Sequence, residues 1–133
     1  MFSKKNNKGF TLMEMLIVVA IIAILIAIMI PTFNAQLEKA REAADAANIR
    51  SAYAEAMVAL ISDEKVDVTT PALTQTVKGW DSIELRDYLK EISESADGKL
   101  DGPLTADDNI VKGKTFTFSV DSTTGEFIVE ASK

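Results

Sequence analysis

The chain has 133 residues, 14 basic and 20 acidic side chains, and a formal net charge of −6. It contains neither cysteine nor histidine. Without cysteine it can form no disulfide, thiolate zinc site, lipid-modified cysteine or thiol nucleophile. Without histidine it lacks the usual general base and the commonest transition-metal ligand. These two absences argue against most classes of enzyme.

The charge is unevenly distributed along the chain. Lys4, Lys5 and Lys8 precede a long apolar segment, and without these three lysines the chain has 11 basic against 20 acidic side chains, a net charge of −9. An acidic domain repels phosphate and is a poor binder of nucleic acid. We therefore expect no specific nucleic-acid partner.

A membrane-spanning helix is predicted from Phe10 to Ile30. These 21 residues carry one charge, on Glu14, and the sixteen residues from Met15 to Ile30 are all apolar. The segment is long enough to cross a bilayer as a helix. Lysines before it and an acidic domain after it favour an orientation with the N-terminus inside and the C-terminus outside.

Two other interpretations of this segment are weaker. A buried helix of a soluble protein is disfavoured because so small a protein can hardly cover sixteen consecutive apolar residues. A discarded secretory signal is disfavoured because the apolar run is too long and no small-x-small cleavage site follows it. The helical pattern also continues past Pro31, which a discarded segment would not need.

The helix is expected to extend to about Ile61. Residues 32–62 contain no proline or glycine and many alanines, which favours helix. A helix from Phe10 to Ile61 would be about 78 Å long. Pro31 lies inside it, so the carbonyl of Ala27 loses its helical donor and a kink is expected there.

Two apolar stripes run along this outer helix on nearly opposite faces. The first comprises Phe33, Leu37, Ala40, Ala44 and Ala47. The second comprises Ile49, Tyr53, Ala56, Met57 and Leu60. The second stripe is expected to carry a globular domain, while the first permits close approach of other helices or simply faces solvent. The charged residues between them are expected to be solvated or to bridge subunits; they are Glu38, Arg41, Glu42 and Asp45.

The globular part begins with weak strand signals. Val66–Thr70 and Leu73–Val77 are short candidate strands or extended loop, interrupted at Pro71. Asp81-Ser82-Ile83-Glu84 has the pattern of a capping box that opens a helix ending near Ser93. Its apolar face is formed by Leu85, Tyr88 or Leu89, and Ile92.

A β-hairpin is the clearest signal in the globular part. Residues 115–120 alternate with a period of two, residues 121–125 have turn composition, and residues 126–130 return. The side chains expected to face the long helix are Phe116, Phe118, Val120, Phe127 and Val129. We predict an antiparallel sheet of three or four strands laid across the second stripe.

One polar loop could attract a hard cation. It carries Asp97, Asp101, Asp107, Asp108 and Asn109, and calcium prefers clustered oxygen ligands. The loop has no EF-hand spacing, so a solvated acidic loop is the preferred interpretation. We predict no metal and no cofactor.

From Lys8 to Leu25 the sequence, KGFTLMEMLIVVAIIAIL, resembles a type IV prepilin. It carries the class III signal that type IV pilins share with the pseudopilins of type II secretion. The close resemblance covers about residues 8–33, and the layout of a long helix followed by a sheet extends it loosely to the rest. The resemblance implies an α+β fold of the type IV pilin kind, with a long N-terminal helix packed against a small antiparallel sheet.

The resemblance also assigns roles to four residues. Gly9 would precede the bond cut by a prepilin peptidase, and its missing side chain suits an extended backbone close to a protease. Phe10 would become the new, N-methylated N-terminus. Glu14 would neutralise the Phe10 amine of a neighbouring subunit during assembly, and an acid in a membrane persists mostly where it has a partner. The helix before Pro31 would be able to lose helicity in an assembled pilus. Many family members have glycine at the position of Ala23, and alanine favours helix by about 1 kcal/mol more than glycine.

The pattern and the resemblance together predict four regions. A basic leader, residues 1–9, is cleaved off; residues 10–30 form the transmembrane and assembly helix. Residues 31–62 continue this helix outside the membrane, and residues 63–133 form the α+β head.

The expected function is that of a structural subunit, the major pilin of a type IV pilus, without enzymatic activity. Copies would polymerise through the N-terminal helix into a helical filament for adhesion, twitching motility, biofilm formation or DNA uptake. The expected partners are the prepilin peptidase, the pilus assembly platform and other copies of the chain. The subunit would be a single-pass protein of the cytoplasmic membrane before assembly and part of an extracellular pilus afterwards.

Other functions stay open at this point. A pseudopilin of type II secretion or a minor or competence pilin would carry the same signal. A single-pass membrane protein whose outer domain binds a ligand would be neither processed at Gly9 nor polymerised. No set of serine, lysine and carboxylate side chains points to an enzyme.

Overall fold

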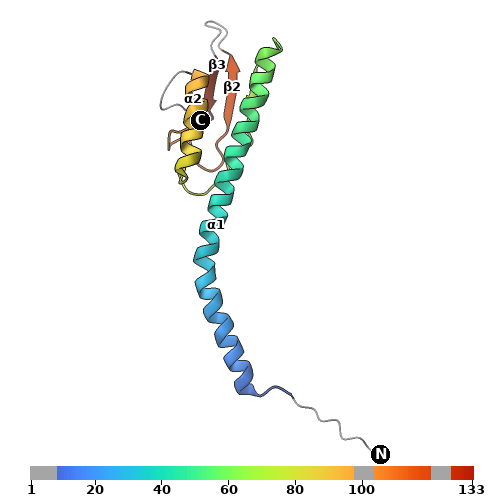
Figure 1. Ribbon diagram of the computed structural model, residues 1–133, viewed down its shortest axis with the longest axis vertical. Helices are drawn as coiled ribbons and strands as arrows, with labels where there is room; N and C mark the ends of the chain where they lie inside the picture. Colours follow the sequence, from blue (N-terminus) through green and yellow to red (C-terminus); the bar gives the residue numbers. More distant parts are fainter. Residues whose placement is uncertain (1–8, 98–103, 121–126) are drawn as a thin grey trace, which may run out of the picture. The chain divides into compact units, whose positions relative to one another are not determined.

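The computed structural model describes residues 9–97, 104–120 and 127–133, with the side chains of residues 93–97 left outside the description. Within these ranges the elements are α1 (Leu12–Ile61), β1 (Asp67–Thr69), α2 (Ile83–Asp97), β2 (Phe116–Val120) and β3 (Phe127–Ala131), drawn in Figure 1. The predicted α+β fold, a long apolar N-terminal helix and a small antiparallel sheet, is confirmed. The chain divides into two compact units, residues 1–35 and 36–133, and α1 passes from the first into the second.

Helix α1 ends at Ile61, as predicted, and begins at Leu12, two residues later than predicted. Its C-terminus is closed by two backbone bonds beyond the helix, from Glu64 N–H to the Ala59 carbonyl at 3.0 Å and from Asp63 N–H to the Leu60 carbonyl at 3.4 Å. Asp63 has a φ of 57°. This is the Schellman arrangement, in which one left-handed residue lets the chain turn back and satisfies the last carbonyls.

The sheet has three strands in the order β1-β2-β3, and both pairs are antiparallel. The hairpin of β2 and β3 pairs Phe118 with Val129. Of the two weak strand candidates, the first forms β1, while the second, Leu73–Val77, is irregular. Of the two predicted alternatives for Leu73–Val77, strand or extended loop, the structure has the loop. The backbone N–H groups of residues 74–77 donate to acidic side chains of α1 instead, and the Leu73 N–H donates to the Lys114 carbonyl.

The core lies between the outer part of α1 and the inner face of the hairpin. Phe116, Phe118 and Val129 are buried, and the other two predicted inward residues, Val120 and Phe127, pack partly buried against the same cluster. The buried apolar residues of α1 are Ala46, Ile49, Ala52 and Ala56. The small alanine side chains let α1 approach the aromatic rings closely, and Tyr53 meets Phe118 and Phe127 edge-on at 6.0 and 6.1 Å between ring centroids.

The second apolar stripe is thus largely confirmed, with a rotation of the buried face. Ile49 and Ala56 are fully buried and Tyr53 is half-buried, but Leu60 is 40% exposed. Buried residues continue instead toward Asp45 and Glu42 at the other end. Ala40, Ala44 and Ala47 of the first stripe are exposed, so that face is open.

Helix α2 begins at Ile83, so its N-cap lies one residue after the predicted Asp81. The helix ends at Asp97 rather than near Ser93. Ser82, not Asp81, caps the helix, because its Oγ accepts the N–H of Leu85 at 3.4 Å. Leu89 and Ile92 are buried, and the Arg50 guanidinium lies 4.1 Å from the centroid of the Tyr88 ring. This cation–π contact joins α2 to α1, while α2 lies beside β3 (Figure 1).

The predicted solvated face of α1 requires a larger correction. Glu42 is 4% exposed and Asp45 is 1% exposed, so neither is solvated or free to bridge subunits. The irregular segment of residues 74–82, which we call the strap, crosses α1 at these positions and donates hydrogen bonds to both carboxylates. Buried carboxylates are tolerated when they accept several hydrogen bonds. The donors here lie 29 to 40 residues away along the chain, so the sequence pattern around Glu42 and Asp45 did not reveal them.

Candidate functional site

The residues before α1 are open to solvent. Gly9, Phe10 and Thr11 lie outside the helix and are exposed, with Phe10 82% exposed. No atom lies within 4 Å of the position that a Gly9 Cβ would take. The peptide bond between Gly9 and Phe10 is therefore in non-helical backbone that another protein can reach.

Thr11 and Glu14 form a capping box at the start of α1. The Glu14 Oε2 accepts the Thr11 backbone N–H at 2.7 Å, and the Thr11 Oγ1 accepts the Glu14 backbone N–H at 3.2 Å. This reciprocal pair satisfies two of the donors that a helix N-terminus leaves without partners. The spacing Thr-x-x-Glu is the sequence signature of a capping box. The capping box was not predicted from the sequence, because Glu14 was interpreted only as an assembly residue.

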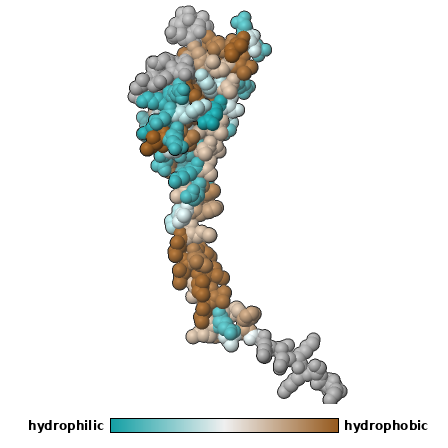
Figure 2. Space-filling view, in the orientation of Figure 1, coloured by the Kyte–Doolittle hydropathy of each residue, from teal (hydrophilic) through white to brown (hydrophobic). Residues whose placement is uncertain are grey.

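The first part of α1 has no cover within the described chain. Every residue from Leu12 to Leu37 is exposed, and the most apolar window of α1 contains no buried residue. By length and composition α1 can cross a membrane, and Figure 2 shows the brown apolar surface along this part of the helix. A core helix of a soluble protein would be mostly buried, so its environment must come from a bilayer or from other chains.

Pro31 lies within α1, which continues through it as a helix. The proline has no N–H to give to the Ala27 carbonyl. One turn is further modified by Thr32, whose Oγ1 donates to the Ile28 carbonyl at 3.4 Å. Such back-bonding by a hydroxyl slightly weakens and bends helices, so the two residues together weaken this turn of α1.

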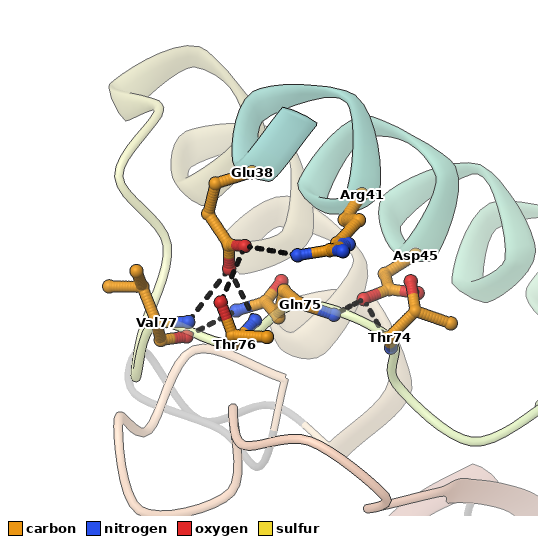
Figure 3. Close-up of polar contacts among 7 residues, drawn as sticks. All are labelled: Glu38, Arg41, Asp45, Thr74, Gln75, Thr76 and Val77. Atoms are coloured by element: carbon orange, nitrogen blue, oxygen red, sulfur yellow. Dashed lines mark hydrogen bonds and ion pairs between the residues drawn. The ribbon is translucent and has the colours of Figure 1, made fainter. Parts of the chain in front are cut away.

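A second polar group lies where the strap crosses α1 (Figure 3). Asp45 Oδ2 accepts the N–H groups of Thr74 and Gln75 at 2.8 and 2.9 Å, and its Oδ1 accepts the Thr74 hydroxyl at 2.9 Å. Glu42 Oε1 accepts the Ser82 N–H at 2.9 Å. The Gln75 side chain is buried as well, and its Nε2 donates to the carbonyls of Val77 and Gly79.

Glu38 completes this group at the edge of the head. Its Oε1 accepts the N–H groups of Thr76 and Val77, and its Oε2 accepts the Thr76 hydroxyl at 2.7 Å and the Arg41 guanidinium at 3.3 Å. Partial burial raises the pKa of Glu38, but the hydrogen bonds from Val77, Thr76 and Arg41 outweigh it and lower the pKa to about 2. Glu38 is therefore ionised over the whole range of ordinary pH.

The acidic loop gives no support to a cation site in the part that the structure describes. Asp101 and the side chain of Asp97 lie outside the described residues. Asp107 pairs with Arg86 at 3.3 Å and Asp108 pairs with Lys78. Among the described residues no group of three or more acidic side chains could hold a metal ion, and the two described aspartates have basic partners.

Comparison with known proteins identifies the N-terminal segment. The prokaryotic N-terminal methylation motif matches residues 4–30. This chain carries the class III signal of type IV pilins. The predicted resemblance is therefore confirmed, and the exposed Gly9–Phe10 bond, Glu14 and the apolar run all lie inside the matched segment.

Two curated relatives are pilus components of Thermus thermophilus. The type IV narrow pilus major component PilA5 is 52% identical over 54 residues, which are 38% of this chain and 47% of the relative. The type IV wide pilus major component PilA4 is 55% identical over 38 residues, 29% of each chain. The matched part thus spans less than half the length of either pilin, and no solved structure matches the chain.

Proposed function

We propose that this protein is the major structural subunit of a type IV pilus and polymerises through the apolar part of α1. The observation that carries the proposal is the exposure of every residue from 12 to 37, most of them apolar, while the buried apolar residues of the described chain form one core. The similarity to two major pilus components supports a major rather than a minor subunit. The filament would serve adhesion, twitching motility, biofilm formation or DNA uptake, and the subunit would act without catalysis.

The proposed life of the subunit begins in the cytoplasmic membrane. Residues 10–30 span it once, with the basic leader inside and the head outside, because lysines are retained on the cytoplasmic side. A prepilin peptidase cuts between Gly9 and Phe10 and Phe10 is N-methylated. The open, non-helical backbone at Gly9 supports this step, since a protease needs an extended substrate. The assembly platform then transfers the subunit into the filament.

Glu14 is proposed to pair with the Phe10 amine of a neighbouring subunit during assembly. An ionised acid near the centre of a bilayer costs about 2.5–3.5 kcal/mol. In the single chain the Glu14 carboxylate already accepts the Thr11 N–H, which lowers this cost in part. The remaining cost would be offset by an ion pair, in which the Glu14 carboxylate accepts a hydrogen bond from the positively charged Phe10 amine of the neighbouring subunit.

Sheared filaments provide the test. Cells are sheared, the fibres are collected and the intact mass of the monomer is measured. A chain that begins at methylated Phe10 and is abundant in the fibres supports the major-pilin proposal. The same processed chain restricted to the membrane fraction contradicts it in favour of a pseudopilin or minor pilin, and an uncut chain that begins at Met1 contradicts the processing step.

A further inference from the structure

Burial changes abruptly along α1. All side chains from Leu12 to Leu37 are exposed, Glu38 is the first that is partly buried, and Glu42, Asp45 and Ala46 are buried. The compact unit that contains the head begins at Gln36. Within the described chain, the helical turns before Glu38 have exposed side chains, while several side chains after it are buried.

The contacts at this change are polar and not apolar. Glu38, Glu42 and Asp45 have the spacing i, i+4, i+7, which places them on one face of the helix. Together they accept seven hydrogen bonds from the strap, five of them from backbone N–H groups. Figure 3 shows that Glu38 and Asp45 point toward successive strap residues.

These bonds couple the helix to the strap. A carboxylate can meet its donors only while its own turn of α1 is formed, so unwinding that turn also breaks the strap bonds. The N–H of the buried Gln75 would then lose its acceptor inside the protein, which is unfavourable. The N–H groups of Thr76 and Val77, at exposed positions, would lose a charged acceptor. Helix and strap therefore open together or not at all.

The segment from Pro31 to Leu37, in contrast, has no such coupling to the strap. Pro31 donates no backbone bond, Thr32 diverts a hydroxyl to the Ile28 carbonyl, and the side chains up to Leu37 are exposed. Opening this segment breaks helical bonds but none of the seven hydrogen bonds to the strap. Local opening with so few contacts needs little free energy.

We infer that the strap sets the limit of local unfolding in α1: opening that begins at Pro31 stops at the turn of Glu38, Glu42 and Asp45. The three carboxylates thus divide one continuous helix into an extensible segment and a fixed one. This property belongs to the single chain and does not depend on polymerisation.

Residue-resolved hydrogen exchange of the full chain in detergent micelles tests the inference. The micelle shields residues 12–30, so fast exchange is expected in a window from Thr32 to about Arg41, since the amides of residues 38–41 bond carbonyls of residues 34–37. Strong protection is expected to begin at Glu42. A gradual rise in protection from Thr32 to Ile49, without a step, would overturn the inference.

Two variants test the contact between Glu38 and Thr76, one by changing the helix and the other by changing the strap. Glu38→Gln removes the charge from α1, and Thr76→Val removes the hydroxyl donor from the strap without changing α1. Each is expected to speed exchange of the amides at residues 42–45 about tenfold or more, because a hydrogen bond to a charged group contributes on that order. Exchange in β2 should change less than about threefold.

Glu55→Gln is the matched control, since Glu55 is an exposed acid of the same helix. It should leave the step unchanged. If Thr76→Val has no more effect on residues 42–45 than Glu55→Gln, the strap does not hold the helix and the inference is wrong. Unchanged fluorescence of the single buried Trp80 confirms in each variant that the head has stayed folded.

Discussion

Two glycines of the head have the same backbone conformation and different surroundings. Gly79 has a φ of 83° and Gly113 a φ of 87°. A Cβ at Gly79 would lie 2.8 Å from Asp107 Oδ1, whereas nothing lies within 4 Å of a Cβ at Gly113. A left-handed conformation disfavours most other residues by roughly 1–2 kcal/mol, so both positions favour glycine. At Gly79 the close approach of Asp107 adds a second reason.

Gly113→Ala is expected to lower the free energy of unfolding by about 1 kcal/mol, through backbone strain alone. Gly79→Ala should lower it by up to about 1 kcal/mol more, because Asp107 must turn away from Arg86 and surface ion pairs contribute about that much. Urea unfolding of the full chain in micelles, followed by Trp80 fluorescence, measures both. Equal losses would show that the Asp107 contact is without effect, and no loss at Gly113 would show that the strain is absent.

At the same scale, Gly9 is the residue proposed to precede the bond that a prepilin peptidase cuts. Gly9→Val adds a branched side chain to backbone that a peptidase must hold in extended form, so cleavage should stop and the full-length chain should stay in the membrane. Immunoblots of membrane fractions separate the uncut from the cut chain by size. Gly113→Ala is the control for a glycine substitution far from the site. Normal cleavage of Gly9→Val would contradict the assignment of this bond.

At the scale of elements, local patterns predicted what local residues determine. The alternation of Phe116, Phe118 and Val120 predicted the hairpin and its buried face because each strand is decided by its own side chains and by the strand that adjoins it in the chain. The choice between strand and loop at Leu73–Val77 could not be made from the sequence, since the N–H groups of this segment find their acceptors on a distant helix. Glu42 and Asp45 were mistaken for solvated residues for the same reason. The spacing of the acids at i, i+4 and i+7 was visible in the sequence, but their donors were not.

The strap also predicts an acid dependence of stability. The pKa of Glu38 is about 2 in the folded chain and near 4.5 without its hydrogen bonds. Because the folded-state pKa is the lower one, Glu38 stabilises the fold above about pH 4.5 and loses this contribution as the pH falls toward 2. Glu38 is partly exposed, so the contribution is roughly 1–3 kcal/mol.

Urea unfolding in non-ionic micelles between pH 6 and 2, followed by Trp80 fluorescence, measures this contribution. The wild-type chain should lose more stability over that range than Glu38→Gln does, and the two curves should converge near pH 2. Asp45 and Glu42 are present in both proteins, so the difference between the two curves reports on Glu38. Parallel curves at all pH values would show that Glu38 is not perturbed.

At the scale of the whole molecule, Glu14 has two roles that must be separated. It is the acidic member of the capping box with Thr11 in the single chain, and it is the proposed charge partner of a neighbouring Phe10 amine in the filament. Glutamine also serves in a capping box but carries no charge. Glu14→Gln therefore keeps the helix start and removes the pairing, while Thr11→Val removes the hydroxyl cap and keeps the charge.

If charge pairing drives assembly, Glu14→Gln should be cleaved normally yet give at least about tenfold fewer sheared filaments, since an ion pair in a low-dielectric site is worth more than about 1.4 kcal/mol. Thr11→Val should fray the first turn, a loss of about 1 kcal/mol, and still assemble. Glu14→Ala combines both defects and should yield no more filaments than Glu14→Gln. The reverse result, with normal filaments from Glu14→Gln and few from Thr11→Val, would mean that assembly depends on an ordered helix start and that the charge of Glu14 is dispensable.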